Sequence, residues 1–262
     1  MRARGLLAAL LVACLSCTGT TGYELVSFYA VARGPADAHP GYTFTSDRGF
    51  QVTLSRAVMH VGAIYLDQSV PTSGSAEQAC TLAGTYVGEV RAGRDVDMLS
   101  PAEQLFPITG NGSTIPAAVG QVWLSGPDVF DPTDATVVLS VAGAATSPVD
   151  GKAYPFSGDI TIDKSRSTSS VGSALPGANP VCALRIVTPI RVGITLAQSG
   201  TLVLDLDPRA LFTNVDFSAL KQFSSDPPSF GFTNDDTNQP SINLYANLRA
   251  AGAVYRFEWR DR

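Results

Sequence analysis

AVMHVGAIYL, residues 57–66, is the most apolar strand-like stretch of the chain beyond its N-terminus. Under the two-residue period of a β-strand its apolar side chains fall on both faces, with Val58, Ile64 and Leu66 on one and Met59, Val61 and Tyr65 on the other. The length also allows a buried helix, but β-branched and aromatic residues favour a strand. The stretch therefore predicts a central strand that is covered on both sides.

Segments on either side of this stretch predict further strands. Residues 50–54 alternate apolar and polar side chains, as in a strand with one buried face. Asp150-Gly151 separates two β-prone segments and predicts a hairpin turn. The predicted strands, in chain order, are residues 23–32, 42–45, 50–54, 57–66, 80–90, 96–99, 122–124, 135–142, 154–162, 181–187, 191–196, 201–206 and 253–259.

Helix signals occur near the C-terminus. Asp207-Pro208 is typical of a helix N-terminus and predicts a short helix over residues 208–212. A second helix is predicted over residues 216–223. Ser241 predicts the N-cap of a third helix, over residues 242–250.

Turn-forming residues are frequent and charges are few. The chain has 24 Gly, 17 Pro and 16% charged residues, against about 25% in an average protein. Residues 100–120 are rich in Pro and Gly and predict an irregular segment, either a long loop or the seam between two subdomains. We therefore expect an all-β fold with minor α content, an antiparallel β-sandwich with short helices near the C-terminus.

The N-terminus carries an export signal. Arg2 and Arg4 precede an unbroken apolar run over residues 6–13, far shorter than the ~20 residues of a membrane-spanning helix. The run closes in Leu11-Val12-Ala13-Cys14, which resembles the lipobox of bacterial lipoproteins. The resemblance implies that a diacylglyceryl group is attached to the Cys14 thiol and that a signal peptidase cuts just before it. Plain secretion and lipidation at Cys17 are the alternatives.

The lipobox resemblance also predicts how the chain is divided and where it resides. Residues 1–13 are the lipoprotein signal peptide, residues 14–22 the lipidated cysteine and its tether, and residues 23–262 the β-sandwich domain. The lipid holds the protein on a membrane of the cell envelope. Leu15 is not the Asp that retains many such proteins in the inner membrane, which implies the outer membrane in a host with two.

Two further runs, residues 47–66 and 200–217, are similar to uncharacterised bacterial envelope lipoproteins, a resemblance that implies no mechanism.

Cys80 and Cys182 are the cysteines of the predicted domain. In an oxidising compartment we expect them to form a disulfide. Closing a loop of roughly 100 residues stabilises by ~4–5 kcal/mol in the chain-entropy model. Two buried free thiols are the alternative.

Catalytic and nucleic-acid signatures are missing from the sequence. A Ser-His-Asp triad would have to use His39 or His60, because these are the two histidines. Neither a Gly-x-Ser-x-Gly elbow nor a His-Glu-x-x-His motif occurs. The net charge is −5 and no basic run exists, so a nucleic-acid partner is not expected. We interpret His60 as a hydrogen-bonded core or rim histidine, and an enzyme is not predicted.

Metal binding is the first alternative function. Three groups offer carboxylate ligands: Asp95 with Asp97, Asp205 with Asp207, and Asp235 with Asp236. Strand alternation puts the members of the first two pairs on one face. Ca²⁺ takes six to eight oxygens, and no EF-hand type series is present, so solvated carboxylates are the simpler interpretation. No resident cofactor is predicted, with calcium or copper as alternatives.

Copper is the second metal hypothesis. The layout is loosely similar to periplasmic copper-handling β-sandwich proteins, a resemblance that implies a histidine with Trp or Met near the metal. His60, Met59 and Trp123 are the candidate residues. Met59 and His60 should point to opposite faces of their strand, which argues against one ion between them.

Aromatic residues support a third class of function. Tyr86, Trp123 and Trp259 can line a groove for a glycan or a protein, although such residues are more often part of a core. This class requires no missing motif. The sequence therefore predicts a lipid-anchored, non-catalytic binding or structural module whose partner is an envelope protein or a glycan.

Overall fold

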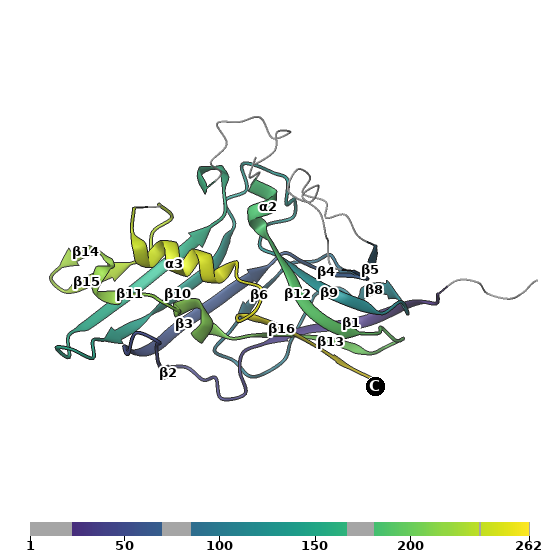
Figure 1. Cartoon of the computed structure of the whole chain (residues 1–262), viewed down its shortest axis with the longest axis horizontal. Helices are drawn as coiled ribbons and strands as arrows, with labels where there is room; N and C mark the ends of the chain where they lie inside the picture. The colour runs from purple at the N-terminus through teal and green to yellow at the C-terminus, as the bar shows by residue number, and fades with distance from the viewer. Residues whose placement is uncertain (1–22, 70–84, 167–180, 236, 262) are drawn as a thin grey trace, which may run out of the picture.

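Two β-sheets make up most of the computed structural model, which describes residues 23–69, 85–166, 181–235 and 237–261. Figure 1 shows the two sheets, and buried side chains from both form one continuous apolar core. Helices are short and few, which confirms the predicted all-β fold with minor α content. In the described part of the chain no helix has the length and apolar character needed to cross a membrane.

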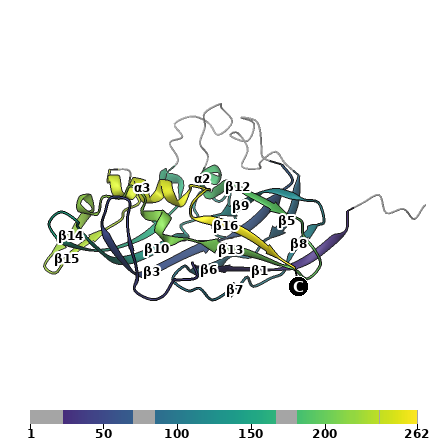
Figure 2. The ribbon, with the colours of Figure 1, turned by 60° about the horizontal axis from the view of Figure 1, so that its bottom comes forward.

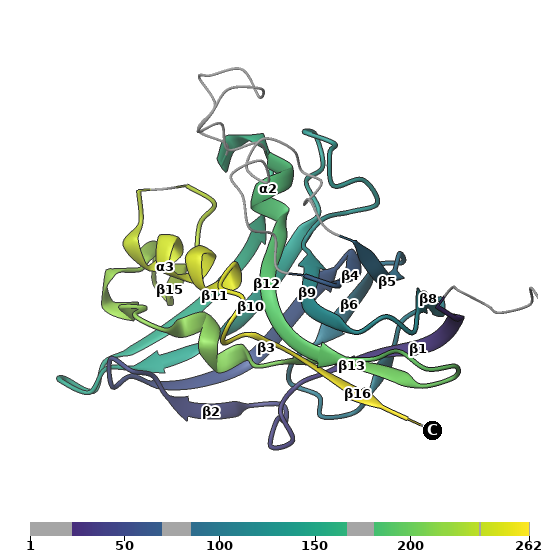
Figure 3. The ribbon, with the colours of Figure 1, turned by 45° about the vertical axis from the view of Figure 1, so that its right-hand side comes forward.

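The larger sheet has nine strands. Their spatial order is β12 (Ile186–Ile194), β9 (Ala117–Trp123), β4 (Ala63–Asp67), β5 (Tyr86–Val90), β8 (Gly110–Ser113), β1 (Leu25–Arg33), β13 (Thr201–Leu206) and β16 (Tyr255–Arg260), with β7 (Gln104–Leu105) paired to β1. The sheet curls until its two end strands, β12 and β16, contact each other (Figure 3).

The smaller sheet has seven strands. Their order is β14 (Lys221–Ser225), β15 (Pro228–Gly231), β11 (Ala153–Thr161), β10 (Val137–Thr146), β3 (Gln51–Val61) and β2 (Tyr42–Thr45), with β6 (Arg94–Asp97) paired to β3. The described pairings are antiparallel except β1 with β13 and β11 with β15. The predicted antiparallel architecture is therefore correct apart from these two pairs.

The central apolar stretch is two strands rather than one. β3 belongs to the seven-stranded sheet and β4 to the nine-stranded sheet, and Gly62 is the break between them. The Gly62 backbone packs against Ser125, so closely that a Cβ on Gly62 would lie 2.2 Å from the Ser125 carbonyl oxygen. Most of the stretch is buried as predicted, although Val58 and Tyr65 are only half-buried, and the stretch connects the two sheets.

The β10–β11 hairpin confirms the turn signal at Asp150-Gly151. Gly151 has φ +69°, a left-handed conformation that glycine adopts without strain. Residues 50–54 also alternate as expected, with Val52 and Leu54 fully buried and Gln51 and Thr53 exposed.

The helices differ in part from the prediction. Asp207 caps a 3₁₀ helix, η3 (Pro208–Phe212), as expected, and Asp216 caps the shorter η4 (Phe217–Ala219). The predicted cap at Ser241 is wrong: α3 (Gln239–Leu248) begins earlier because the Asn238 side chain accepts the Ser241 N–H. α3 lies over the seven-stranded sheet (Figure 2).

Two predicted segments are corrected by long-range packing. Residues 181–187 were expected as a strand but start with a helical turn, α2 (Val181–Arg185), before β12. Residues 100–120 were expected to be irregular but contribute β7, β8 and the start of β9 to the larger sheet. Glycine suits β8 because a Cβ on Gly110 would lie 2.3 Å from the Phe28 ring.

Candidate functional site

A pocket of about 610 Å³ opens where the chain passes between the two sheets. Three connections form it: the break at Gly62, the β5–β6 turn and the β9–β10 loop. We call it the seam pocket. Its lining residues are His60, Gly62, Ala63, Tyr65, Arg91, Gly93, Trp123, Ser125, Gly126, Pro127, Asp128, Val129, Phe130 and Thr136. A cavity of this size suits a small molecule.

Aromatic rings from neighbouring strands form one wall of the seam pocket. The centroid of the Tyr65 ring lies 4.5 Å from that of Trp123, on the adjacent strand β9, and 5.2 Å from that of Tyr86, on β5. Trp123 also packs on a small second apolar cluster of Val129, Cys182 and Ile186. Tyr86 and Trp123, two of the three aromatics expected to line a groove, therefore lie on either side of Tyr65, and of these two Trp123 lines the seam pocket while Tyr86 does not.

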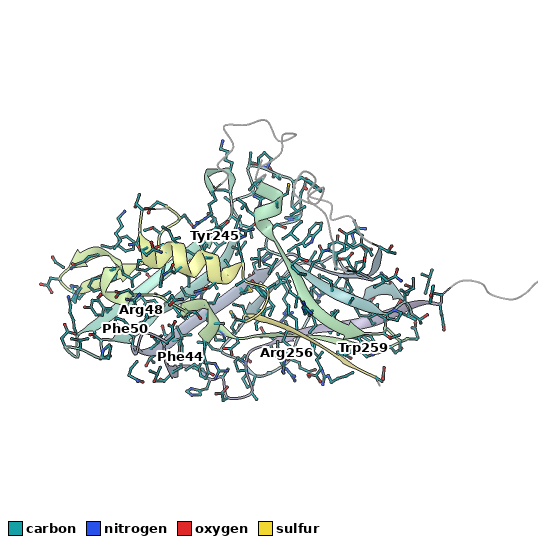
Figure 4. All side chains as sticks on the ribbon, viewed as in Figure 1. Phe44, Arg48, Phe50, Tyr245, Arg256 and Trp259 are labelled. Atoms are coloured by element: carbon teal, nitrogen blue, oxygen red, sulfur yellow. The ribbon has the colours of Figure 1, made fainter. Side chains whose placement is uncertain are left out.

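The third predicted aromatic, Trp259, lies elsewhere. It sits on β16 (Figure 4), and its ring packs at 5.7 Å against Phe28 at the core. Its indole N–H donates to Asp261. Trp259 is therefore a packing residue and does not line the seam pocket.

His60 reaches the seam pocket from the end of β3. Its Nδ1 lies 2.6 Å from Oδ1 of Asp95, the residue directly opposite on β6. Its Nε2 lies beside Gly93, where an added Cβ would be 3.0 Å away. Met59 is fully buried on the opposite face of the strand, as its alternation with His60 predicts. His60 is thus a rim histidine, oriented by a carboxylate.

The β9–β10 loop that covers one side of the pocket is held by a buried cation. Arg185 is fully buried and donates to the carbonyl oxygens of Val129, Asp131 and Asp134 at 2.7–3.0 Å. It also donates to the carbonyl of Ile162 at 2.8 Å. Four backbone acceptors therefore converge on one guanidinium, whose Nη2 also lies 3.8 Å from Oδ2 of Asp134, and together these contacts fix the loop.

Aspartates at regular spacing shape the same loop. Asp128, Asp131 and Asp134 each accept the N–H two residues further on. Burial raises the pKa of Asp134, but the Thr136 hydroxyl, the N–H groups of Thr136 and Gly126 and the Arg185 charge outweigh it, so the pKa lies below its usual range. The loop presents Phe130, 53% exposed, at the pocket rim.

The charges at the rim are of both signs. Arg91, on the β5–β6 turn, is mostly exposed, and its Nη1 lies 4.0 Å from Oε1 of Glu89. Asp128, on the β9–β10 loop, also lines the pocket. Together with the aromatic wall, these groups suit a ligand that has a flat apolar face and polar edges without a large net charge.

The remaining predicted ligands do not gather. Asp97 accepts the N–H of Leu99, and Asp207 caps η3 while pairing with Arg209. Asp235 accepts from Thr237. Within the described residues, no group of three or more His, Cys, Asp or Glu side chains is arranged to hold a metal ion. Asp236, like Cys14 and Cys80, lies outside the described residues.

Asp205 belongs to a separate cleft with balanced charges. It pairs with Arg33 at 2.7 Å and with Arg256 at 2.8 Å, and Arg256 lies along β16 (Figure 4). Asp207 and Arg209 line the same cleft. Its arginines and aspartates neutralise one another, so we interpret it as an ion-pair network between β1, β13 and β16.

Sequence reasoning missed several residues of the seam pocket. Arg91, Phe130 and the supporting Arg185 carried no recognised motif. The signal for Arg185 was a lone arginine inside the apolar run VCALRIV, residues 181–187, because an arginine there is either exposed or fully hydrogen-bonded. Tyr65 was predicted as buried, but it is half-exposed at the pocket.

The chain is thus an all-β protein of two sheets with one aromatic-walled pocket at the passage between them. No protein-family model matches it, and no curated protein does. A solved structure, MbnP from Methylosinus trichosporium, superimposes with a TM-score of 0.44 and 11% sequence identity, covering 91% of this chain and 99% of that chain. The function is therefore argued from the site itself.

Proposed function

We propose that this chain is a non-catalytic binding protein of the cell envelope and that the seam pocket is its binding site. The supporting observation is the pocket of about 610 Å³ with Tyr65 and Trp123 as its wall. Buried supports such as Arg185 hold the covering loop in place before a ligand arrives, and such preorganisation favours affinity.

The ligand that fits best is a glycan. A pyranose ring has one flat apolar face, which suits the Trp123 and Tyr65 rings, and hydroxyl groups that can bond to donors and acceptors alike. The rim supplies both, with Arg91 as donor and Asp128 as acceptor. An extended peptide with aromatic side chains could stack on the same rings, but a pocket of about 610 Å³ would hold only a short part of it.

Anchoring of the protein at a membrane is the second part of this proposal. It is supported by the lipobox Leu11-Val12-Ala13-Cys14, in residues outside the described structure. A Cys14→Ala variant should lose the mass of the lipid and move from the membrane to the soluble fraction. A variant that keeps both the mass and the membrane fraction contradicts lipidation at Cys14.

Glycan binding is tested by the fluorescence of Trp123. Residues 23–262 with Trp259→Phe carry Trp123 as their one tryptophan. Titration with chito- and malto-oligosaccharides should change its emission saturably, whereas the matched variant Trp123→Phe, reporting through Trp259, should show no change. Absence of a saturable response to every oligosaccharide, at concentrations up to about 1 mM, where binding energies are near 4 kcal/mol, rejects the glycan.

Copper binding is a second candidate, favoured by the His60–Asp95 pair. A carboxylate that holds one ring nitrogen of a histidine is the usual support of a metal-binding imidazole, and imidazole suits copper. The structure brings His60 and Trp123 to the same pocket, whereas Met59 is buried on the opposite face. His60 would hold the ion through Nε2.

The melting temperature separates the two candidates. A ligand at 100 times its Kd stabilises the folded state by about 2.7 kcal/mol. We expect copper to raise the melting temperature of the wild type and of His39→Gln, a control in an exposed loop, but not of His60→Gln. An equal shift in all three proteins, or none, rejects a copper site at His60.

A further inference from the structure

A buried hydrogen-bond chain leads from the seam pocket into the sheet. The Trp123 indole N–H donates to Oε1 of Gln121 at 3.2 Å, and Nε2 of Gln121 donates to Oδ2 of Asp67. Gln121 and Asp67 are both fully buried. They lie on adjacent strands, β9 and β4, whose residues Gln121 and Tyr65 stand directly opposite each other.

The direction of this chain is fixed by the chemistry of its ends. An indole nitrogen can only donate, and a carboxyl oxygen without a proton can only accept. A primary amide joins them in one orientation, with its nitrogen toward Asp67 and its oxygen toward Trp123. If the amide turned over, two donors would meet at Trp123 and two acceptors at Asp67. Asp67 therefore determines which way the Gln121 amide points.

The buried Asp67 carboxyl lowers the stability of the folded state, so stability by itself does not account for an aspartate at this position. Within the described residues its Oδ1 has no hydrogen-bond partner, and a buried polar atom without a partner destabilises the folded state. Burial raises the pKa of the Asp67 carboxyl, although the Gln121 bond acts against this. An apolar side chain at this strand position would bury its surface without that penalty.

We infer that Asp67 and Gln121 are positioning residues of the seam pocket, which hold the Trp123 indole against Tyr65 at the geometry that a ligand meets. The role of this arrangement in ligand binding rests on the proposed function. Its structural content, a rigid indole with a protected N–H, is independent of which ligand binds. Neither residue lines the pocket, so both act through Trp123.

The indole proton of Trp123 tests this inference directly. The protein has two tryptophans, so ¹⁵N labelling gives two indole signals, and Trp259→Phe assigns them. In the wild type the Trp123 proton should exchange with solvent more slowly than that of Trp259, whose acceptor Asp261 is exposed. Gln121→Met keeps the side-chain length but removes the acceptor, and it should accelerate exchange at Trp123 by about tenfold, the loss of one buried hydrogen bond.

Conservative replacement separates positioning from simple packing. Asp67→Asn keeps an oxygen that accepts from Gln121 and should retain slow exchange, whereas Asp67→Leu should resemble Gln121→Met. Exchange at Trp123 that is as fast as at Trp259 in the wild type overturns the inference, even if every variant fails to fold. So does slow exchange that survives Gln121→Met in a protein that still melts cooperatively. Failure of all ligands to bind would reject the proposed function and leave these exchange rates unchanged.

Discussion

Gly62 and Ser125 touch through their backbones, with room for no side chain between them: a Cβ on Gly62 would lie 2.2 Å from the Ser125 carbonyl oxygen. This contact joins the β3–β4 break to the start of the β9–β10 loop. It also forms the floor of the seam pocket.

A Gly62→Ala substitution should therefore destabilise the protein. The added methyl group meets backbone rather than a flexible side chain, so strands must shift, which costs about 1–3 kcal/mol. Chemical denaturation measures the change. Gly193→Ala is the matched control, because a Cβ there has no atom within 4 Å, and it should alter stability little. Equal stabilities for the two variants would contradict the close contact.

Replacing Arg185 should affect both stability and the pocket loop. Arg185→Met leaves the carbonyls of Val129, Asp131, Asp134 and Ile162 without their donor. Each buried carbonyl that is left without its donor costs about 1–3 kcal/mol, so we expect a loss of stability of at least this size. Arg185→Lys should recover only part of this, since an ammonium lacks the planar fork.

Urea unfolding of these two variants provides the measurement, with Arg191→Met, at an exposed residue of β12, as the control. Increased proteolysis of residues 126–136 in Arg185→Lys would show that the loop has loosened. A fall in stability no greater than that of Arg191→Met contradicts the role of Arg185.

Asp134 should contribute to the acid sensitivity of the fold. Its folded-state pKa is depressed, so the unfolded chain binds protons first as the pH falls. The stabilisation is complete above the unfolded pKa of about 3.9 and is lost as the pH falls through the lower folded pKa. Asp134→Asn should flatten the acid limb of the stability profile, measured by urea unfolding at a series of pH values, and an unchanged acid limb in this variant contradicts the prediction.

The Cys80–Cys182 disulfide stays a prediction of the sequence. Cys182 is buried in α2 beside Trp123, and Cys80 lies outside the described residues. Alkylation in denaturant without reductant should leave both residues of the 23–262 domain unmodified, and peptide mapping should recover them as one linked pair. Cys182→Ala should lower stability by about 4 kcal/mol. Alkylation of both thiols would show that they are free.

Local signals in the sequence predicted those parts of the fold that local chemistry determines. Gly151 marks its hairpin and Asp207 its cap because each acts on residues next to it in the chain. The helical turn at α2 could not be recognised, since the run 181–187 is apolar in either conformation and Arg185 finds its acceptors some 23 to 56 residues away.

In the site, too, residue type was informative, whereas contacts between distant segments could not be predicted. Tyr86 and Trp123 were proposed as groove residues from their type alone, and of the two Trp123 lines the seam pocket. His60 was interpreted as a hydrogen-bonded core or rim histidine, and it lies at the rim. That Tyr65 would join the two aromatics depends on the β4–β5 and β4–β9 pairings, which no local pattern specifies. The break at Gly62 was missed for the same reason, because the Ser125 backbone that excludes a side chain comes 63 residues later in the numbering.

The parallel pairing of β1 with β13 has a consequence for synthesis. Tyr29 is paired with Thr201 and Arg33 with Asp205, and the last strand, β16, completes the sheet on the far side of β13. β1 can pair with β7 and β8 as soon as residues 104–113 have been made, but its parallel neighbour β13 follows only after residue 200. Pairings this distant in sequence form slowly, so we expect the β13 side of β1 to stay unpaired, and available to chaperones, until β13 and β16 have been made.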